Sequence, residues 1–338
     1  MTLAEAFRDQ ARSCAALGSP FMARLMDLLA ARLTPDHGAV AAALHGWAGD
    51  PSSRGHSLPL RLAGGLHALR RAGRGDLAAT YPPGMPSDDA LWSAVDAALR
   101  DEAAFLLDWV RGAPQTNEVG RSAAFRAAAH VVAARFGHPM RWMELGASAG
   151  LNLHWPRYRL HGPGWSRGPD DAALALRPDW DGPAPPDTAP VVERAGGVDL
   201  NPVADGDRLL AYLWPDQPDR IARTRAALAL PRLPVARADA LDWLPGRLEA
   251  VPGVTRVVAQ SVAWQDFPAA AQDQLRAVIE AAGARATAHA PLAWIGMEGD
   301  GDGPGAALTL RLWPEGSETL LARVDFHGRW VRWIGEAG

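Results

Sequence analysis

The chain has 338 residues and a formal net charge of −4 at pH 7, and 48% of its residues are hydrophobic. This length allows one or two domains with a full core, and the negative charge argues against a protein that binds nucleic acid by neutralising phosphates. The chain has no lysine and a single cysteine, Cys14, which excludes Schiff-base chemistry, an intrachain disulfide and a cysteine-rich metal site.

The N-terminal segment MTLAEAFRDQ contains acidic residues and no continuous apolar run. No stretch of about eighteen apolar residues, the length of a membrane span, follows it. We therefore expect a soluble, cytoplasmic protein that has no membrane partner.

Residues 2 to 111 show the pattern of a helical domain. Apolar residues recur every three or four positions in segments 2–17 and 20–33, which is typical of amphipathic helices. Ser87 is a suitable N-cap for one long helix over residues 87–110, whose buried stripe would contain Leu91, Val95, Leu99, Leu106 and Trp109. We predict a helical N-terminal domain over residues 1–113 and a second domain over residues 114–338.

A polar segment, QTNE at residues 115–118, precedes a predicted helix over residues 119–137. Thr116 or Asn117 would cap this helix; alternatively, the segment folds over a ligand site, where Asn117 would bind substrate and Glu118 would act as a general base. Arg121 either pairs with Glu118 at helical spacing or binds a substrate carboxylate.

The segment RWMELGASAGLNL at residues 141–153 predicts a strand, a glycine turn and the start of a helix, as in nucleotide-type cofactor sites. Such a turn needs residues without a Cβ, because its backbone is tight and must leave room for a ligand. A dinucleotide fingerprint would need glycines in place of Ser148 and Leu151, and a P-loop would need a lysine. The S-adenosylmethionine pattern, an acid followed by G-x-G-x-G, fits Glu144, Gly146 and Gly150 and departs only at Ser148.

Two other interpretations of this segment remain open. GASAG also matches the G-x-S-x-G nucleophile elbow of serine hydrolases, in which Ser148 would be the nucleophile, Asp266 the acid and His289 or His327 the base. The third interpretation is an ordinary buried strand followed by a turn of small residues.

Three further predicted strands end near polar residues. The first ends at Asp199, where such folds bind ribose; the second ends near Asp239, which with Ala240 would hold the adenine end; the third, VTRVVAQ, ends at Gln260. Ligands in open α/β sheets bind outside the carboxyl ends of the strands. We therefore expect these residues to converge with Glu144, although each acid alone is more typical of a helix cap or loop.

More than the usual 20 or so residues separate the glycine turn from Asp199, which indicates an insertion at about residues 154–196. Segments 154–165, 173–180 and 190–197 alternate in polarity and predict added β-structure. His154 is a candidate general base. We predict no metal site, because His154 and His161 lack carboxylate or cysteine partners at ligand spacing.

The C-terminal part predicts a helix over residues 268–283 and strands over 285–297, 306–313 and 318–326, the last two joined in a hairpin by residues 314–317. A parallel sheet closed by an antiparallel hairpin is the methyltransferase arrangement. The segment QSVAWQ at residues 260–265 lacks the Asp/Asn-Pro-Pro-aromatic signature of enzymes that methylate planar nitrogens. Trp264 and Gln265 are candidates for the substrate pocket wall, although Trp264 is more typical of a core.

The blocks QTNEVGRSA, ELGASAGLNL, VDLNP, DALDWL, QSVAWQ and HGRWVRW, which span most of residues 115–333, resemble the bacterial domain-of-unknown-function family 2332. This resemblance implies a Rossmann-like methyltransferase fold with a helical N-terminal region and supplies no established substrate. We expect an α/β protein: a class I methyltransferase sheet, parallel with an antiparallel C-terminal hairpin, plus an all-helical N-terminal domain.

The function that we expect is transfer of a methyl group from S-adenosylmethionine to a small molecule, with a hydroxyl or carboxylate acceptor favoured over a nucleobase nitrogen. The alternatives are a serine hydrolase that uses Ser148 and a protein that binds S-adenosylmethionine without catalysis. The sequence leaves the oligomeric state open.

Overall fold

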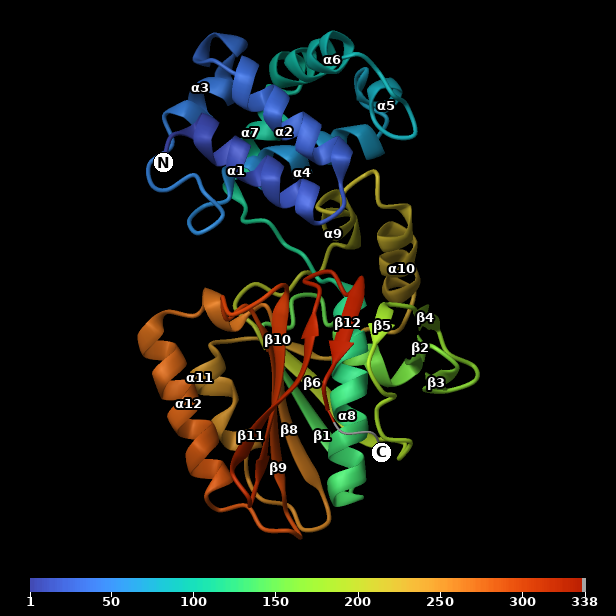
Figure 1. The fold of residues 1–338 in the computed structure, drawn as a ribbon. Helices are drawn as coiled ribbons and strands as arrows, with labels where there is room; N and C mark the ends of the chain where they lie inside the picture. Colours follow the sequence, from blue (N-terminus) through green and yellow to red (C-terminus); the bar gives the residue numbers. More distant parts are fainter. Residues whose placement is uncertain (336–338) are drawn as a thin grey trace. The chain divides into compact units, whose positions relative to one another are not determined.

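A computed structural model describes residues 1–335 and divides the chain into two compact units (Figure 1). The helical unit consists of Met1–Thr116 and Asp205–Ala222, and the sheet unit consists of Asn117–Ala204 and Arg223–Gly338. The helical unit is therefore discontinuous in sequence, which nothing in residues 205–222 had indicated.

The helical unit begins with a capping box at Thr2, whose hydroxyl accepts from the Glu5 backbone N–H at 3.2 Å while the Glu5 carboxylate accepts from the Thr2 backbone N–H at 2.8 Å. Within the described residues, its elements are α1 (Leu3–Ala16), α2 (Pro20–Arg32), η1 (Pro35–His37), α3 (Ala39–His45), α4 (Leu58–Arg71), α5 (Leu77–Thr80), α6 (Asp88–Asp101), α7 (Ala103–Arg111) and α9 (Gly206–Ala211), and α10 (Pro218–Leu228) begins in it.

One helix prediction was wrong in this unit. Ser87 does cap a helix, since its hydroxyl accepts from the Ala90 N–H at 3.2 Å, but the chain breaks at Glu102 into α6 and α7. The Glu102 carboxylate accepts from Arg74, and the change of direction lets α7 pack against α4. Tertiary packing therefore overrides a continuous helical pattern here.

The sheet unit is built on a mixed sheet, which within residues 1–335 has nine strands in the order β5-β12-β11-β10-β9-β8-β1-β6-β7. Its strands are β1 (Met140–Leu145), β5 (Asp179–Asp181), β6 (Val192–Asp199), β7 (Val235–Arg237), β8 (Thr255–Ser261), β9 (Leu292–Glu298), β10 (Ala306–Trp313), β11 (Ser317–Val324) and β12 (Trp330–Trp333). Neighbouring strands from β7 to β9 are parallel, and β9 to β12 form an antiparallel meander. The α/β class is thus confirmed.

The remaining elements of this unit cover the sheet or follow its strands. They are η2 (Val119–Arg121), α8 (Ser122–Phe136), η3 (Leu151–Arg157), α11 (Ala240–Trp243), η4 (Pro245–Arg247), η5 (Trp264–Asp266), α12 (Ala269–Gly283) and the small sheet of β2 (Tyr158–Gly162), β3 (Trp165–Arg167) and β4 (Leu174–Leu176). In Figure 1, α8 lies on one face of the main sheet and α11 and α12 lie on the other.

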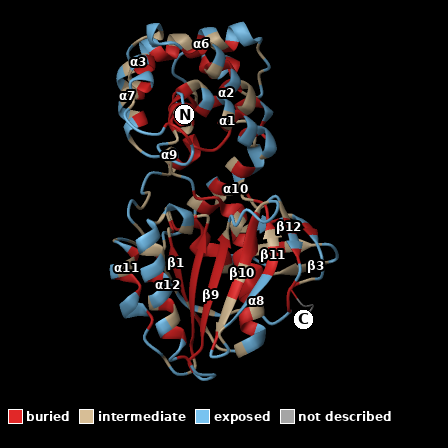
Figure 2. Ribbon diagram, turned by 60° about the vertical axis from the view of Figure 1, so that its left-hand side comes forward, coloured by how far each residue is buried: buried red, intermediate tan, exposed pale blue. Residues whose placement is uncertain are grey.

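Alternation along β1 assigns its side chains to these two faces. Trp142 packs edge-on against Phe125 of α8, with ring centroids 5.3 Å apart, so Trp142 and Glu144 face α8. Met143 and Leu145 belong instead to the apolar cluster formed with α11 and α12. The central strands are buried on both faces, as the red strands in Figure 2 show, which is typical of a parallel sheet.

Several predicted boundaries in this unit need correction. The glycine turn leads into a helix, as predicted, but this is the short 3₁₀ helix η3, which contains Pro156 and ends where β2 begins. Residues 190–197 were assigned to the insertion but belong largely to β6 of the main sheet, and β5 pairs with β12. The hairpin of β10 and β11 is confirmed, but β12 and β5 lie beyond it.

No helix within residues 1–335 combines the length and the apolarity needed to cross a bilayer.

Candidate functional site

The candidate site lies at the carboxyl ends of β1 and β8. From β1 the sheet continues through β6 and β7 on one side and through β8 and β9 on the other, so this is the point where the strand order reverses. Open α/β sheets bind ligands at such switch points. The turn after β1 and the turn after β8 meet there: a Cβ added to Gly146 would lie 2.5 Å from the Ala263 Cβ.

The turn after β1 has left-handed backbone at alternate residues. The φ angles of Gly146, Ser148 and Gly150 are 68°, 52° and 74°, which favours glycine and makes Ser148 the strained member. The Gly146 and Ala147 N–H groups both donate to the Val198 carbonyl, at 2.9 and 3.1 Å. The turn is therefore folded back onto the end of β6.

The two glycines also allow close packing within the protein. A Cβ at Gly146 would contact Ala263, and a Cβ at Gly150 would lie 2.8 Å from Val235 Cγ2. The sequence analysis assigned this space to a ligand. In the structure, the side chains of Ala263 and Val235 lie directly beside the two glycines, so the glycines set the position of the turn, and a ligand would reach this edge through Glu144 and Asp199.

Asp199 ends β6 as predicted, and its carboxylate organises the turn. One oxygen accepts from the Ser148 N–H at 2.9 Å and the other from the Asn201 N–H at 2.8 Å. A carboxylate has about four acceptor positions, so both oxygens keep capacity for a further donor. Asp199 is partly exposed.

Glu144 is the most unusual group at this edge. Only 2% of the residue is exposed, and its Oε2 is buried without a hydrogen-bond partner. Burial raises the pKa of this carboxyl well above its usual range; Arg121 lowers it and Asp199 raises it further. A buried carboxyl group whose oxygen has no hydrogen-bond partner is stabilised either by protonation or by a hydrogen bond from a cationic donor.

Arg121 places a positive charge among the acids. Its Nε donates to the Phe326 carbonyl at 2.9 Å and its Nη1 to the Ser261 carbonyl at 3.1 Å. These bonds hold the guanidinium between the end of β8 and the turn before β12. From there its charge lowers the pKa of Glu144, Asp266 and Glu298.

Glu298 was not predicted from the sequence; it follows Met297 at the end of β9, on the face of Gly296 and Gln260 and opposite to that of Glu144. Its Oε1 accepts from the Ala263 and Trp264 N–H groups, both at 3.1 Å, while its Oε2 is buried without a partner. Burial raises the pKa of this carboxyl to about 7. The signal was an acid directly after a buried apolar strand, but the predicted strand stopped one residue earlier, at Met297.

The turn after β8 is strained. Val262 has φ 50°, a conformation that is unfavourable for a β-branched residue, and its N–H donates to the Met297 carbonyl at 2.8 Å. Such strain often accompanies ligand sites. Within residues 117–335 the two non-glycine residues with positive φ, Val262 and Ser148, both lie at this edge.

The structure does not bring Gln260 into this group. Gln260 is in register with Leu145, whereas Glu144 is in register with Ala259, so Gln260 and Glu144 project from opposite faces of the sheet. The Gln260 Oε1 accepts from the Trp294 indole at 2.9 Å. Gln260 therefore belongs to the core on the α12 side.

Asp239, Ala240, Trp264 and Gln265 make no recorded contact with Glu144 among the described residues, and each has another role or environment. Asp239 caps α11, since its Oδ1 accepts from the Leu241 N–H at 2.8 Å, and Ala240 is buried in the apolar cluster beside α11. Trp264 packs against Trp294 with ring centroids 5.3 Å apart, as expected of a residue that contributes to the core. Gln265 is exposed.

The predicted polar segment before α8 contributes structural contacts. The Asn117 Oδ1 accepts from the Leu151 N–H at 2.8 Å. Glu118, not Thr116 or Asn117, caps the helix start: its Oε1 accepts from the Gly120 N–H at 2.9 Å and lies 3.4 Å from Arg223. Asn117 thus ties this segment to the start of η3, next to the glycine turn.

His154 is buried in η3. Burial lowers its pKa, as does Arg157, while the Pro231 carbonyl raises it. The hydrogen bonds recorded for residues 1–335 include none between His154 and Glu144 or Asp199. His154 instead contacts the Pro231 carbonyl, in the segment before β7.

Of the two histidines considered for the hydrolase arrangement, His289 does not lie near Ser148. The His289 carbonyl accepts from the Gly253 N–H just before β8, so His289 lies at the amino end of the strands, opposite Ser148. The His327 carbonyl lies beside Gly120, and within residues 1–335 the hydrolase arrangement with Asp266 and His327 stays a prediction. The same part of the chain holds no group of three His, Cys, Asp or Glu residues arranged for a metal ion.

The chain was compared with known protein families and with curated proteins. One family, described as "Uncharacterized protein conserved in bacteria (DUF2332)", matches residues 4–333. The match confirms the family resemblance seen in the sequence and extends it over the helical unit. Comparison with curated proteins returned no match.

Proposed function

The chain belongs to this uncharacterized bacterial family, and we propose that it is an S-adenosylmethionine-dependent methyltransferase that acts on a small molecule. The proposal depends on the residues at the carboxyl ends of β1 and β8. It assigns the cofactor to Glu144, the glycine turn and Asp199.

The observation that carries the proposal is the buried, unpartnered Oε2 of Glu144 beside the glycine turn. S-adenosylmethionine has an α-ammonium group and a sulfonium, and a cationic donor would stabilise the ionised carboxylate there. Asp199, at the end of the neighbouring strand, keeps acceptor capacity for ribose hydroxyls. The residues at this edge therefore fit the charge and the polar groups of the cofactor.

The bound cofactor would supply an electrophilic methyl group, and the protein would position the acceptor and exclude water. A hydroxyl acceptor must also lose a proton. Glu298 suits this step, because its pKa of about 7 lets it accept a proton near neutral pH. We assign the general base to Glu298 in place of Glu118, which caps η2 and pairs with Arg223.

Isothermal titration with S-adenosylmethionine and S-adenosylhomocysteine tests the proposal. We expect micromolar binding, about −8 kcal/mol, that weakens at least tenfold in Glu144→Gln and in Asp199→Asn. Glu318→Gln, at an exposed residue of β11, is the control and should bind normally. The absence of binding heat for the folded wild-type protein with either ligand would refute the proposal.

Ser148→Gly separates the methyltransferase from the hydrolase. It completes the G-x-G-x-G pattern at a residue whose φ of 52° favours glycine, so a methyltransferase should keep or improve its cofactor affinity. A serine hydrolase would lose all activity. Cofactor binding without methyl transfer to any hydroxyl or carboxylate acceptor would support the non-catalytic alternative.

A further inference from the structure

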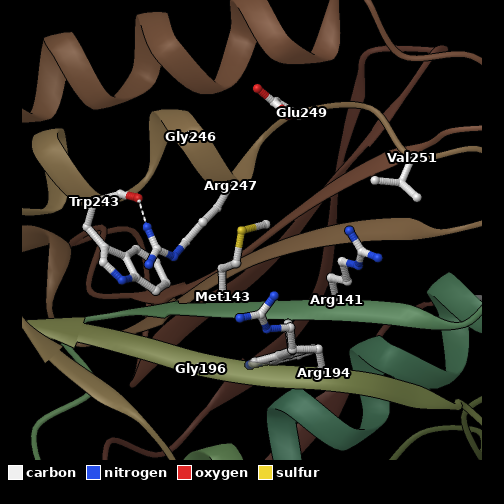
Figure 3. Close-up of a pocket in the computed structure, with 10 residues that line it drawn as sticks. Arg141, Met143, Arg194, Gly196, Trp243, Gly246, Arg247, Glu249 and Val251 are labelled. Carbon is white, nitrogen blue, oxygen red and sulfur yellow. Dashed lines mark hydrogen bonds between the residues drawn. The ribbon is translucent and has the colours of Figure 1, made fainter.

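The sheet unit contains a second cavity of about 390 Å³ over the amino-terminal halves of β1 and β6 (Figure 3). It lies on the face of Met143, opposite to the face of Glu144, and is bounded on the other side by η4 and the residues after it. Gly196, the register partner of Met143, has no side chain to fill the cavity, and a Cβ built on it would have no neighbour closer than 3.5 Å. This cavity is therefore separate from the candidate cofactor site.

Three arginines line the cavity. Arg141 and Arg194 are register partners on neighbouring parallel strands, so they project side by side from the same face, and like charges in this position are destabilising. Arg141 pairs with Glu193. For Arg194, within residues 1–335, no hydrogen bond or ion pair is recorded.

Arg247, the third arginine, is held in place. Its Nη1 donates to the Trp243 carbonyl at 2.7 Å, and its guanidinium lies 4.3 Å from the centroid of the Trp243 ring. Stacking on an aromatic ring leaves the planar guanidinium pre-organised for a further partner. Glu249 is the one acid among the residues that line the cavity, and Figure 3 shows its carboxyl directed away from the guanidiniums.

A cavity in the helical unit provides a comparison. It has a volume of about 240 Å³ and is also lined by three arginines, Arg71, Arg74 and Arg208. There, Arg71 pairs with Asp207 and Arg74 with Glu102, so the protein supplies the negative charge. The cavity beside β1 and β6 is the one that keeps an excess of positive charge.

We propose that this second cavity binds a small molecule that carries a phosphate group. Guanidinium groups match phosphate oxygens with two parallel hydrogen bonds, and, because Arg141 is paired with Glu193, Arg194 and Arg247 are the arginines lining the cavity that remain for a phosphate. The volume is at the low end for small-molecule sites, and Met143 and the Trp243 ring provide an apolar wall for the organic part. This site does not depend on the proposed methyltransferase activity.

Titration calorimetry with phenyl phosphate, inorganic phosphate, phenol and succinate tests this assignment in the full chain. We expect phenyl phosphate to bind more tightly than inorganic phosphate, and phenol and succinate to bind at least tenfold more weakly. Affinity should fall as NaCl is raised from about 0.05 to 0.5 M. Succinate binding as tightly as phenyl phosphate, or no binding of phenyl phosphate, would overturn the phosphate assignment.

Matched variants locate the site. Arg194→Gln and Arg247→Gln, both at exposed residues, should each weaken phenyl phosphate binding by about tenfold without changing the melting temperature. Arg237→Gln, at an exposed arginine at the end of β7, should leave binding unchanged. Gly196→Leu should abolish it by filling the hollow. Equal weakening by Arg237→Gln would show non-specific attraction and would overturn the proposal.

Discussion

Replacing Glu298 with glutamine should stabilise the protein, and the gain should grow as the pH rises. Burial raises the pKa of this carboxyl from 4.5 to about 7 in the folded state. The stability that the protonated group contributes is fully present below the unfolded pKa, near 4.5, and is lost as the pH rises through the folded pKa, near 7. Glutamine keeps an oxygen for the Ala263 and Trp264 N–H groups and cannot ionise.

The size of the effect follows from the two pKa values. At about 1.4 kcal/mol per pH unit, a rise from 4.5 to about 7 corresponds to roughly 3 kcal/mol above pH 7. Slightly less than 1 kcal/mol of this is already lost at pH 5. The stability advantage of Glu298→Gln over wild type should therefore increase by about 2 to 3 kcal/mol between pH 5 and pH 8.

Urea unfolding at several pH values, followed by tryptophan fluorescence, measures this advantage. Glu318→Gln, which removes an exposed carboxyl of the same unit, should give a difference that hardly changes with pH. A difference for Glu298→Gln that stays constant, or that shrinks as the pH rises, would refute the reasoning. Loss of methyl transfer in the stabilised variant would be the usual exchange of activity for stability at a functional site.

Three further substitutions test the backbone and the core. Ser148→Gly should raise the free energy of unfolding by about 0.5 to 1 kcal/mol, because it relieves a φ of 52°, whereas Ser148→Ala should give no gain in the same urea titration. Gly150→Ala should lower the free energy of unfolding by about 1 to 3 kcal/mol, since φ is 74° and the new Cβ would lie 2.8 Å from Val235. Gly246→Ala is the control, because a Cβ built there has no neighbour within 4 Å. Arg256→Lys should lower the free energy of unfolding, measured by thermal unfolding, by about 2 kcal/mol or more. The reason is that the buried Arg256 guanidinium donates to the Leu248 and Ala290 carbonyls at 2.5 and 2.7 Å. A decrease of less than about 0.5 kcal/mol would contradict this reasoning.

Much of the candidate site at the carboxyl ends of the strands was predictable from the sequence. Parallel strands are apolar and buried, and the polar residue after each strand lies at the same edge of the sheet. This rule correctly located Glu144 and Asp199 at the carboxyl ends of neighbouring strands, β1 and β6. The same rule would have found Glu298, had the strand been extended by one residue.

What the sequence did not predict depends on register and on tertiary packing. Gln260 follows the same rule as Glu144, but a register that pairs it with Leu145 turns it to the other face, and a single sequence does not reveal register. Residues 190–197 alternate like an exposed added strand and yet form most of β6. Residues 205–222 look like any amphipathic segment and pack with the helical unit.

The last prediction concerns the affinity for S-adenosylmethionine as a function of pH. Glu144 and Glu298 are, in the described part of the sheet unit, the two carboxyl groups with a buried oxygen that lacks a partner. The pKa of Glu144 is raised mainly by burial, so an ammonium ligand, which needs the ionised carboxylate, competes with a proton for this group. Affinity for the cofactor should therefore increase as the pH rises, by up to about tenfold per pH unit below that pKa.

Glu144→Gln separates this effect from all other titrations. Glutamine has no proton to lose, so the variant should bind weakly and with a much flatter dependence on pH, whereas Asp199→Asn should bind weakly but keep the slope of the wild type. Calorimetric titrations of the three proteins between pH 6 and pH 9 measure both quantities. An affinity that falls with rising pH in the wild type, or a slope that survives in Glu144→Gln, would mean that the unpaired oxygen of Glu144 does not receive the ammonium group, and the cofactor assignment would lose its main support.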